Sequence, residues 1–160
     1  QRFEECGNNS VVVASSNEGN FETKLENSNG KLDITVRKTF THNLLENDIT
    51  TSVGATRIEP GQAERVADYT SGTAGSGVDI YANGSIYVGK AQRELKGTSF
   101  AAPRVSAVMA KIHLLNPNLS SSQVEDLMRN SLTKDVESPE GPVKALDYDK
   151  VSRFLSSSVH

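Results

Sequence analysis

The chain has 160 residues, which is enough for one domain with a hydrophobic core. Its 17 basic and 20 acidic residues leave a net charge of −3 without a long run of one sign, so nothing points to nucleic acid or to a membrane surface. No apolar stretch approaches the roughly 20 residues that span a bilayer, and Cys6, the only cysteine, excludes a disulfide or a thiolate metal site within the chain.

A helix end and a buried strand are the first elements that the sequence predicts. Residues 1–7 end in Gly7, and a glycine at this place is typical of a helix stop. The apolar run Val11–Ala14 predicts a strand buried on both faces of a parallel sheet, and a polar loop over residues 15–20 follows it. These features form the second half of a right-handed helix–strand crossover, so we expect the chain to begin within an α/β unit.

A β-hairpin is predicted after this loop. The segments Phe21–Leu25 and Leu32–Val36 alternate apolar and polar side chains, as half-buried strands do. Between them stands Asn29-Gly30, the strongest short turn signal for a hairpin. His42 follows in a polar stretch and is interpreted as a solvated loop histidine.

Helices are predicted in the second half of the chain. Apolar residues recur at helical spacing from Val105 to Leu115, so a helix should begin close to Ser99, with Pro103 in its first turn. The sequence Ser120–Gln123 is that of a capping box and should open a second helix. A short final helix is expected over residues 145–155.

The segment Gly97–Pro103 carries the strongest functional signal. Ser99 is expected where an extended segment turns into a helix, close to free backbone N–H groups and to the positive end of the helix dipole. Negative charge that develops near Ser99 would be stabilised there. The sequence Gly-Thr-Ser-Phe-Ala-Ala-Pro resembles the nucleophile motif of the subtilisin-like serine proteases. The alternative is a plain helix N-cap, a position that serine and threonine favour.

A second match lies upstream. The sequence Val-Val-Val-Ala-Ser-Ser-Asn-Glu-Gly over residues 11–19 resembles the strand of the same family that places an asparagine amide in the oxyanion hole, and Asn17 matches that asparagine. A neutral donor suits acyl transfer, because the charge develops on a carbonyl oxygen that is uncharged in the substrate. Alone, Asn17 reads as an ordinary turn asparagine. Two family motifs in the right order favour the functional interpretation. The family usually has glycine where this chain has Ser16.

The resemblance implies an α/β fold of the subtilisin-like three-layer type with a mostly parallel sheet. Residues 1–160 would be the C-terminal portion of that peptidase domain, with the hairpin inserted at the rim of the substrate cleft. Three segments between the two motifs resemble the family's strands, namely Ile49–Ala55, Ala67–Ser71 and Val78–Gly84.

The resemblance also implies the roles of particular residues. Ser99 would be the nucleophile and Asn17 the oxyanion donor. Four residues would contact the substrate: Ala14, Ser15, Ser16 and Thr98. No metal ligand is assigned. No cofactor is evident. The family resemblance allows calcium, although no site for it is identifiable. The resemblance also implies a secreted or extracytoplasmic location.

Two expected motifs are missing. A subtilisin-like triad runs Asp, His, Ser along the chain, and neither an Asp-Ser/Thr-Gly nor a His-Gly-Thr sequence occurs here. His113 lies within the helix after Ser99, and His160 is the last residue. The resemblance therefore implies that the general base and its carboxylate lie upstream, in a half of the catalytic domain that would be the partner of this chain.

These observations predict a serine endopeptidase that hydrolyses peptide bonds through a Ser99 acyl-enzyme as part of a larger protein. The chain alone is expected to be inactive. Peptides or proteins are the expected substrates, and no nucleic acid or membrane segment is expected. The alternative is a non-catalytic subtilisin-fold scaffold or binding domain, but such a scaffold would need neither Ser99 nor Asn17.

Overall fold

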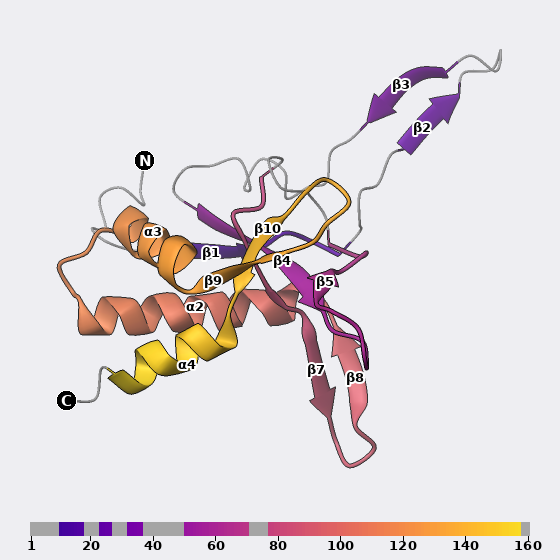
Figure 1. Cartoon of the computed structure of the whole chain (residues 1–160). Helices are drawn as coiled ribbons and strands as arrows, with labels where there is room; N and C mark the ends of the chain where they lie inside the picture. Colours follow the sequence, from indigo (N-terminus) through magenta and orange to yellow (C-terminus); the bar gives the residue numbers. More distant parts are fainter. Residues whose placement is uncertain (1–9, 18–22, 27–31, 37–49, 71–76, 158–160) are drawn as a thin grey trace.

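The computed structural model describes residues 10–17, 23–26, 32–36, 50–70 and 77–157 (Figure 1). The helix end expected over residues 1–7 lies outside these ranges, as do Cys6, the Asn29-Gly30 turn, His42 and His160.

A six-stranded sheet forms the centre of the fold, in the order β1-β4-β6-β10-β9 with β5 paired to β4. Its strands are β1 (Val11–Ala14), β4 (Thr50–Arg57), β5 (Arg65–Val66), β6 (Ile80–Asn83), β9 (Thr133–Val136) and β10 (Val143–Leu146). Strands β1, β4, β6 and β10 run parallel, whereas β5 and β9 pair antiparallel with their neighbours. The expectation of an α/β fold with a mostly parallel sheet is confirmed.

Strand β1 lies at the edge of the sheet within the described part of the chain. It pairs in register with β4, from Val11 opposite Thr50 to Ala14 opposite Val53. All four residues of β1 are half-buried. The prediction of a strand buried on both faces is therefore wrong here, because Val12 packs against the core under the helices while no described helix covers the opposite face of β1.

Three helices cover one face of the sheet: α2 (Thr98–Leu115), α3 (Ser121–Ser131) and α4 (Tyr148–Ser157). Their buried residues form one core with Val53 and Ile80 of the sheet. On the opposite face, the described residues contribute a smaller strand-and-loop cluster around Tyr81, without a helix. The third layer that the resemblance implies is thus not found in the described ranges.

The capping box at the start of α3 is confirmed. The Ser120 hydroxyl accepts a hydrogen bond from the Gln123 N–H at 3.3 Å, and the Gln123 side chain accepts one from the Ser120 N–H at 2.8 Å. These reciprocal bonds satisfy N–H groups that a helix start leaves unpaired.

Two helix predictions need correction. Pro103 lies inside α2 and beyond its first turn, so it cannot donate the helical hydrogen bond that the Ser99 carbonyl would otherwise accept. The last helix begins at Tyr148, because Leu146 still belongs to β10 and pairs with Thr133 of β9. Asp147 separates the two elements by accepting hydrogen bonds from the first N–H groups of α4.

Two β-hairpins lie apart from the central sheet (Figure 1). The predicted one is confirmed by β2 (Thr23–Glu26) and β3 (Leu32–Val36), which pair antiparallel. The second, β7 (Ser85–Val88) and β8 (Arg93–Lys96), was not predicted. It ends directly before Gly97 and therefore connects the central sheet to the start of α2.

Tyr81 makes a testable contribution to stability at alkaline pH. Its side chain is 2% exposed, and burial, reinforced by the charge of Glu140, raises its pKa from 10.0 to about 12. The native state therefore holds the phenol proton more tightly than the unfolded state. This stabilisation is complete below pH 10.0 and is lost as the pH rises through about 12.

We expect the free energy of unfolding to fall by about 2–3 kcal/mol over that pH range through Tyr81. Denaturant unfolding at about pH 9 and about pH 11.5 measures the change, which Tyr81→Phe should remove. Tyr87→Phe is the matched control, because Tyr87 is 60% exposed. An equal pH dependence in the wild type and in Tyr81→Phe would contradict the assignment.

Candidate active site

Ser99 is exposed in the first turn of α2. The N-cap of this helix is Gly97, in extended backbone with φ 162° and ψ 154°, and it makes no side-chain cap bond. The segment Gly97–Ser99 thus does provide the N-cap, but through Gly97 and not through the serine or threonine that the position favours. The predicted turn from extended chain to helix is confirmed. Ser99 thus lies at the positive end of α2. The neighbouring N–H groups are already bonded, that of Thr98 to Asn17 Oδ1 and that of Phe100 to the Gly97 carbonyl.

Asn17 is held against the same helix start. Its side-chain oxygen Oδ1 accepts hydrogen bonds from the Thr98 N–H at 2.7 Å and from the Thr98 hydroxyl at 3.0 Å. Because a backbone N–H can only donate, the amide oxygen must face Thr98. The Nδ2 group of Asn17 is thereby turned away from this bond and keeps its two N–H donors.

Gly97 allows this close approach. A Cβ atom at this position would lie 3.2 Å from Asn17 Nδ2 and 3.5 Å from its Oδ1. A side chain here would therefore require the Asn17 amide to shift by a few tenths of an ångström. The loop after β1 and the start of α2, which are far apart in the sequence, meet at this point.

This arrangement can stabilise negative charge on an oxygen atom next to Ser99. Asn17 Nδ2 and the Ser99 N–H are both donors, and α2 adds its dipole. Donors that are held in place before any charge appears stabilise a transition state efficiently, and the two bonds to Thr98 hold the Asn17 side chain.

The four predicted substrate contacts divide into two pairs. Ala14 and Ser16 are half-buried, so a ligand could reach them, and their assignment stays a prediction. Ser15 and Thr98 are fully buried. Their side chains lie behind the accessible surface, and their assignment as substrate contacts also stays a prediction. The Thr98 hydroxyl bonds Asn17.

The backbone conformation at Ser16 is one that favours glycine, the residue that the resembled family usually has at this position. Its φ of 82° is in the left-handed region, which costs an ordinary residue about 1–2 kcal/mol. Glycine avoids this cost, although it loses about 0.5–1 kcal/mol through its greater freedom in the unfolded chain.

We therefore expect Ser16→Gly to stabilise the protein by about 0.5–1 kcal/mol, equivalent to a rise in Tm of roughly 1–4 °C. Calorimetry measures the difference. Ser16→Ala is the control, because it keeps the Cβ atom and should not stabilise. A lower Tm for the glycine variant than for the alanine variant would contradict this account of the strain.

The described residues place no histidine near Ser99. His113 is in the last turn of α2, where Ser10 Oγ lies 3.1 Å from its Nε2. At the usual rise per helical residue, His113 lies about 21 Å from Ser99 along the axis, far beyond the ~3 Å reach of a general base. The described part of the chain also lacks any cluster of three or more His, Cys, Asp or Glu side chains that could hold a metal ion.

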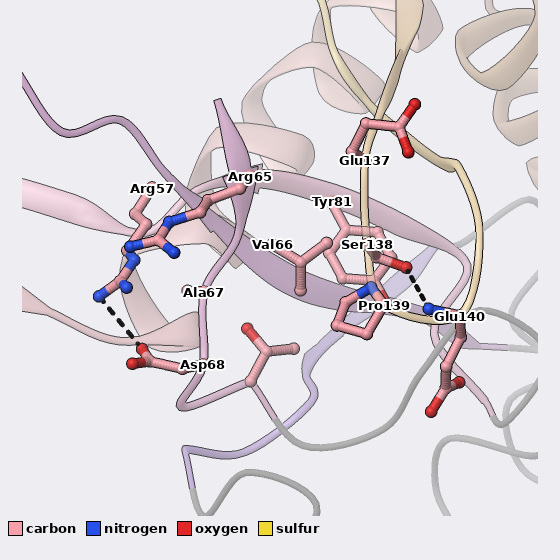
Figure 2. A pocket seen from close by; sticks show the side chains of 11 residues that line it. Arg57, Arg65, Val66, Ala67, Asp68, Tyr81, Glu137, Ser138, Pro139 and Glu140 are labelled. Carbon is pink, nitrogen blue, oxygen red and sulfur yellow. Dashed lines mark hydrogen bonds and ion pairs between the residues drawn. The ribbon is translucent and has the colours of Figure 1, made fainter. Parts of the chain in front are cut away.

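A cavity of about 430 Å³ lies on the face of the sheet opposite α2 (Figure 2). Val66, Tyr81 and Pro139 form its apolar part. The 3.3 Å ion pair of Arg57 with Asp68 stands at its edge. None of the predicted site residues lines this cavity, so it is separate from the arrangement around Ser99.

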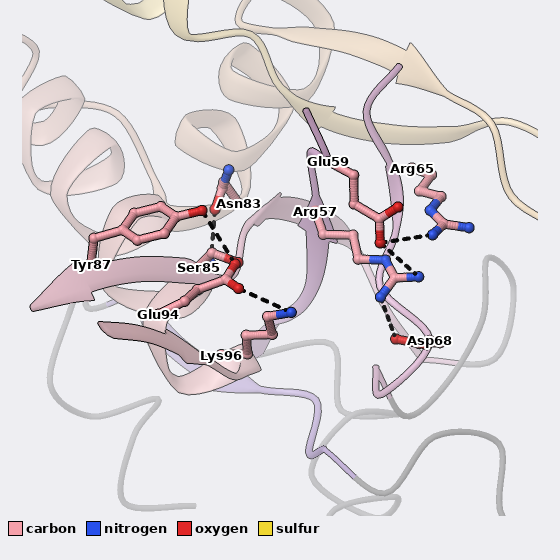
Figure 3. A network of polar contacts seen from close by, with 9 residues as sticks. All are labelled: Arg57, Glu59, Arg65, Asp68, Asn83, Ser85, Tyr87, Glu94 and Lys96. Carbon is pink, nitrogen blue, oxygen red and sulfur yellow. Dashed lines mark hydrogen bonds and ion pairs between the residues drawn. The ribbon is translucent and has the colours of Figure 1, made fainter. Parts of the chain in front are cut away.

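The hairpin that precedes α2 carries a polar network of its own (Figure 3). Glu94 pairs with Lys96 at 3.0 Å, and this hydrogen-bonded partner lowers the pKa of Glu94. Asn83 Oδ1 accepts a hydrogen bond from the Ser85 N–H at 2.8 Å. These contacts order the base of the hairpin next to Gly97.

Comparisons with known proteins agree with this geometry. A family profile described as the Subtilase family matches residues 3–151. Subtilisin-like protease 1 of Plasmodium vivax is 40% identical over 42 residues, which is 26% of this chain and 7% of that protein. M-protease of Shouchella clausii (strain KSM-K16) is 38% identical over 63 residues, which is 37% of this chain and 17% of that protein.

Solved structures share the fold. Sphericase matches with a TM-score of 0.52 and 25% identity, over 76% of this chain and 39% of its own. A structure titled "Structural basis of subtilase cytotoxin SubAB assembly" matches with a TM-score of 0.56 and 20% identity, over 98% of this chain and 52% of its own. The chain thus spans about half, or less, of each of these structures.

None of the described helices is long and apolar enough to cross a membrane.

Proposed function

The chain belongs to the subtilase family, and on this basis we propose that it is the nucleophile-bearing part of a serine endopeptidase. One observation carries the proposal. Thr98 holds Asn17 by two hydrogen bonds beside the exposed Ser99 at the start of α2. A scaffold requires neither an exposed serine at a helix start nor an amide group oriented beside it.

In the proposed reaction, Ser99 Oγ attacks the carbonyl carbon of a peptide bond. The proposed base that removes the hydroxyl proton is a histidine outside these 160 residues, because the chain contains no His-Gly-Thr motif and His113 lies at the far end of α2. Asn17 Nδ2 and the Ser99 N–H stabilise the negative charge on the carbonyl oxygen. The C–N bond then breaks, the leaving amine takes the proton from the histidine, and water hydrolyses the acyl-enzyme on Ser99.

A test follows from the missing base. A serine hydroxyl is a weak nucleophile at neutral pH unless a base lies within about 2.6–3.2 Å. We expect a fluorophosphonate probe to label the intact protein strongly at Ser99, and to label neither its Ser99→Ala form nor this chain alone. Gel fluorescence and mass spectrometry of the modified peptide report the site.

Two outcomes would change the interpretation. Rapid labelling of the isolated chain at Ser99 would show that it contains its own base. No labelling of a folded and processed intact protein would favour the non-catalytic scaffold. Circular dichroism of each sample is needed beside the labelling, so that an unfolded protein is not read as an inactive one.

A further inference from the structure

Arg104 connects α2 to the segment Asn83–Ser85, where β6 ends and β7 begins. Its Nη2 donates a hydrogen bond to the Ser85 carbonyl at 2.9 Å. Its guanidinium carbon lies 5.9 Å from the centre of the Tyr148 ring, and Nη1 lies 3.5 Å from the Tyr148 hydroxyl. One side chain of the nucleophile helix therefore contacts the hairpin base and the start of α4 together.

The backbone of Asn83–Ser85 is held from several sides. The Asn83 N–H donates to the Tyr148 hydroxyl at 3.1 Å, and the Gly84 N–H donates to the Thr56 carbonyl at 2.9 Å. The Ser85 N–H donates to Asn83 Oδ1. Since each of these donors has a partner, a shift of the segment would break several hydrogen bonds at once.

The same segment positions the residue before the nucleophile motif. The Gly84 carbonyl accepts a hydrogen bond from the Gly97 N–H at 2.9 Å. No side chain fits at Gly84 without a shift of its neighbours, since a Cβ there would lie 2.5 Å from the Tyr69 hydroxyl oxygen and 2.6 Å from the Ala55 Cβ. The location of Gly97, and of Thr98 after it, therefore depends on where Gly84 lies.

These contacts close a ring through the site. The Gly97–Gly84 bond forms one side, the bond from Arg104 to Ser85 forms another, and α2 joins Gly97 to Arg104 covalently. We call this ring the Arg104 brace. Thr98, which holds Asn17 Oδ1, lies within the ring next to Gly97.

We propose that Arg104 is a positioning residue that acts through Ser85 and Gly84 to align Asn17 with Ser99. The proposal rests on the proposed function for its catalytic consequence. Arginine suits the task because its planar fork bonds a carbonyl and lies over an aromatic ring with the same group, whereas lysine offers one compact charge. The guanidinium hydrogen bond is also charge-assisted, and so stronger than a neutral one.

The test uses the intact protein in two measurements. First, hydrogen–deuterium exchange compares wild type, Arg104→Met and Arg104→Lys. We expect Arg104→Met to accelerate exchange in a peptide covering residues 94–100 by about tenfold or more, with Arg104→Lys in between and residues 50–57 of β4 unchanged. Arg153→Met is the matched control, because Arg153 is exposed on α4 and bonds within its own helix.

Second, kinetics separate alignment from substrate binding. We expect Arg104→Met to lower kcat about 10–100-fold with KM nearly unchanged, as for a small misplacement of reacting groups. If Arg104 acts through Asn17, its effect must shrink in an Asn17→Ala background, because a removed donor cannot be misaligned. Arg104→Lys, which keeps the charge, replaces Arg104→Met if the methionine variant does not fold.

The outcomes are distinguishable. Unchanged exchange at residues 94–100 would overturn the brace whatever the activity. An effect fully additive with Asn17→Ala, or one on KM alone, would overturn its action through the oxyanion donor. A third outcome separates the two proposals. If Arg104→Met exchanges faster than the wild type, but the wild-type protein is never labelled at Ser99 by the fluorophosphonate probe, the brace is supported and the proposed function is refuted.

Discussion

Replacing Ser99 with alanine in the intact protein is expected to lower kcat for peptide hydrolysis by about 10⁶, a magnitude known from subtilisin itself. The reason is that alanine has no atom to form the acyl-enzyme, so only direct attack by water on the bound peptide remains. Substrate binding should persist, because Ser99 contributes one small side chain to the site. Hydrolysis of a fluorogenic peptide at saturating concentration measures kcat.

Ser106→Ala is the control for this substitution. Ser106 lies on the same helix, and its hydroxyl donates to the Ala102 carbonyl at 3.0 Å, so its removal should leave kcat unchanged. Equal activity of the Ser99→Ala and wild-type proteins would show that the nucleophile is elsewhere. A parallel loss in both serine variants would indicate damage to α2 rather than to the reaction.

Replacing Asn17 with alanine is expected to lower kcat by about 10²–10³ while KM changes little. This magnitude also comes from subtilisin. The amide donor bonds the carbonyl oxygen most strongly once that oxygen is charged, so its loss raises the energy of the transition state more than that of the bound substrate. Steady-state kinetics on the intact protein separate the two constants.

Asn116→Ala is the matched control, because Asn116 is an exposed asparagine at the other end of α2. An unchanged kcat for Asn17→Ala would place the oxyanion donor elsewhere. A large rise in KM at constant kcat would assign Asn17 to substrate binding instead, although its hydrogen bonds to Thr98 would remain a feature of the fold.

Elements that depend on neighbouring residues were predictable from the sequence. The start of α2 near Ser99 follows from apolar spacing, and the start of α3 follows from the Ser120 and Gln123 capping box. The β2–β3 hairpin follows from alternation on both sides of a turn signal. In each case the stabilising contacts join residues that are a few positions apart, so the pattern is visible in a short window.

Short strands that depend on distant partners were missed or misplaced. β9 contains Lys134 and Asp135, and β10 contains Lys144, so neither has a clear strand pattern. They form because they pair with each other, with Val136 and Val143 buried on the face opposite α2. The extent of burial of β1 likewise depends on which elements cover its two faces, which its own apolar sequence does not reveal.

For the site, the order of residues alone was enough to identify the chemical groups: a serine hydroxyl at a helix start and an amide in the loop after a strand. That Thr98 bonds Asn17, that Ser16 adopts a strained backbone and that Arg104 reaches Ser85 became visible in the folded chain. Helix starts and turns are set by local backbone sterics and hydrogen bonding. Contacts between the site's parts arise when β1, β6 and α2 pack against β4, and that packing is a property of the whole chain.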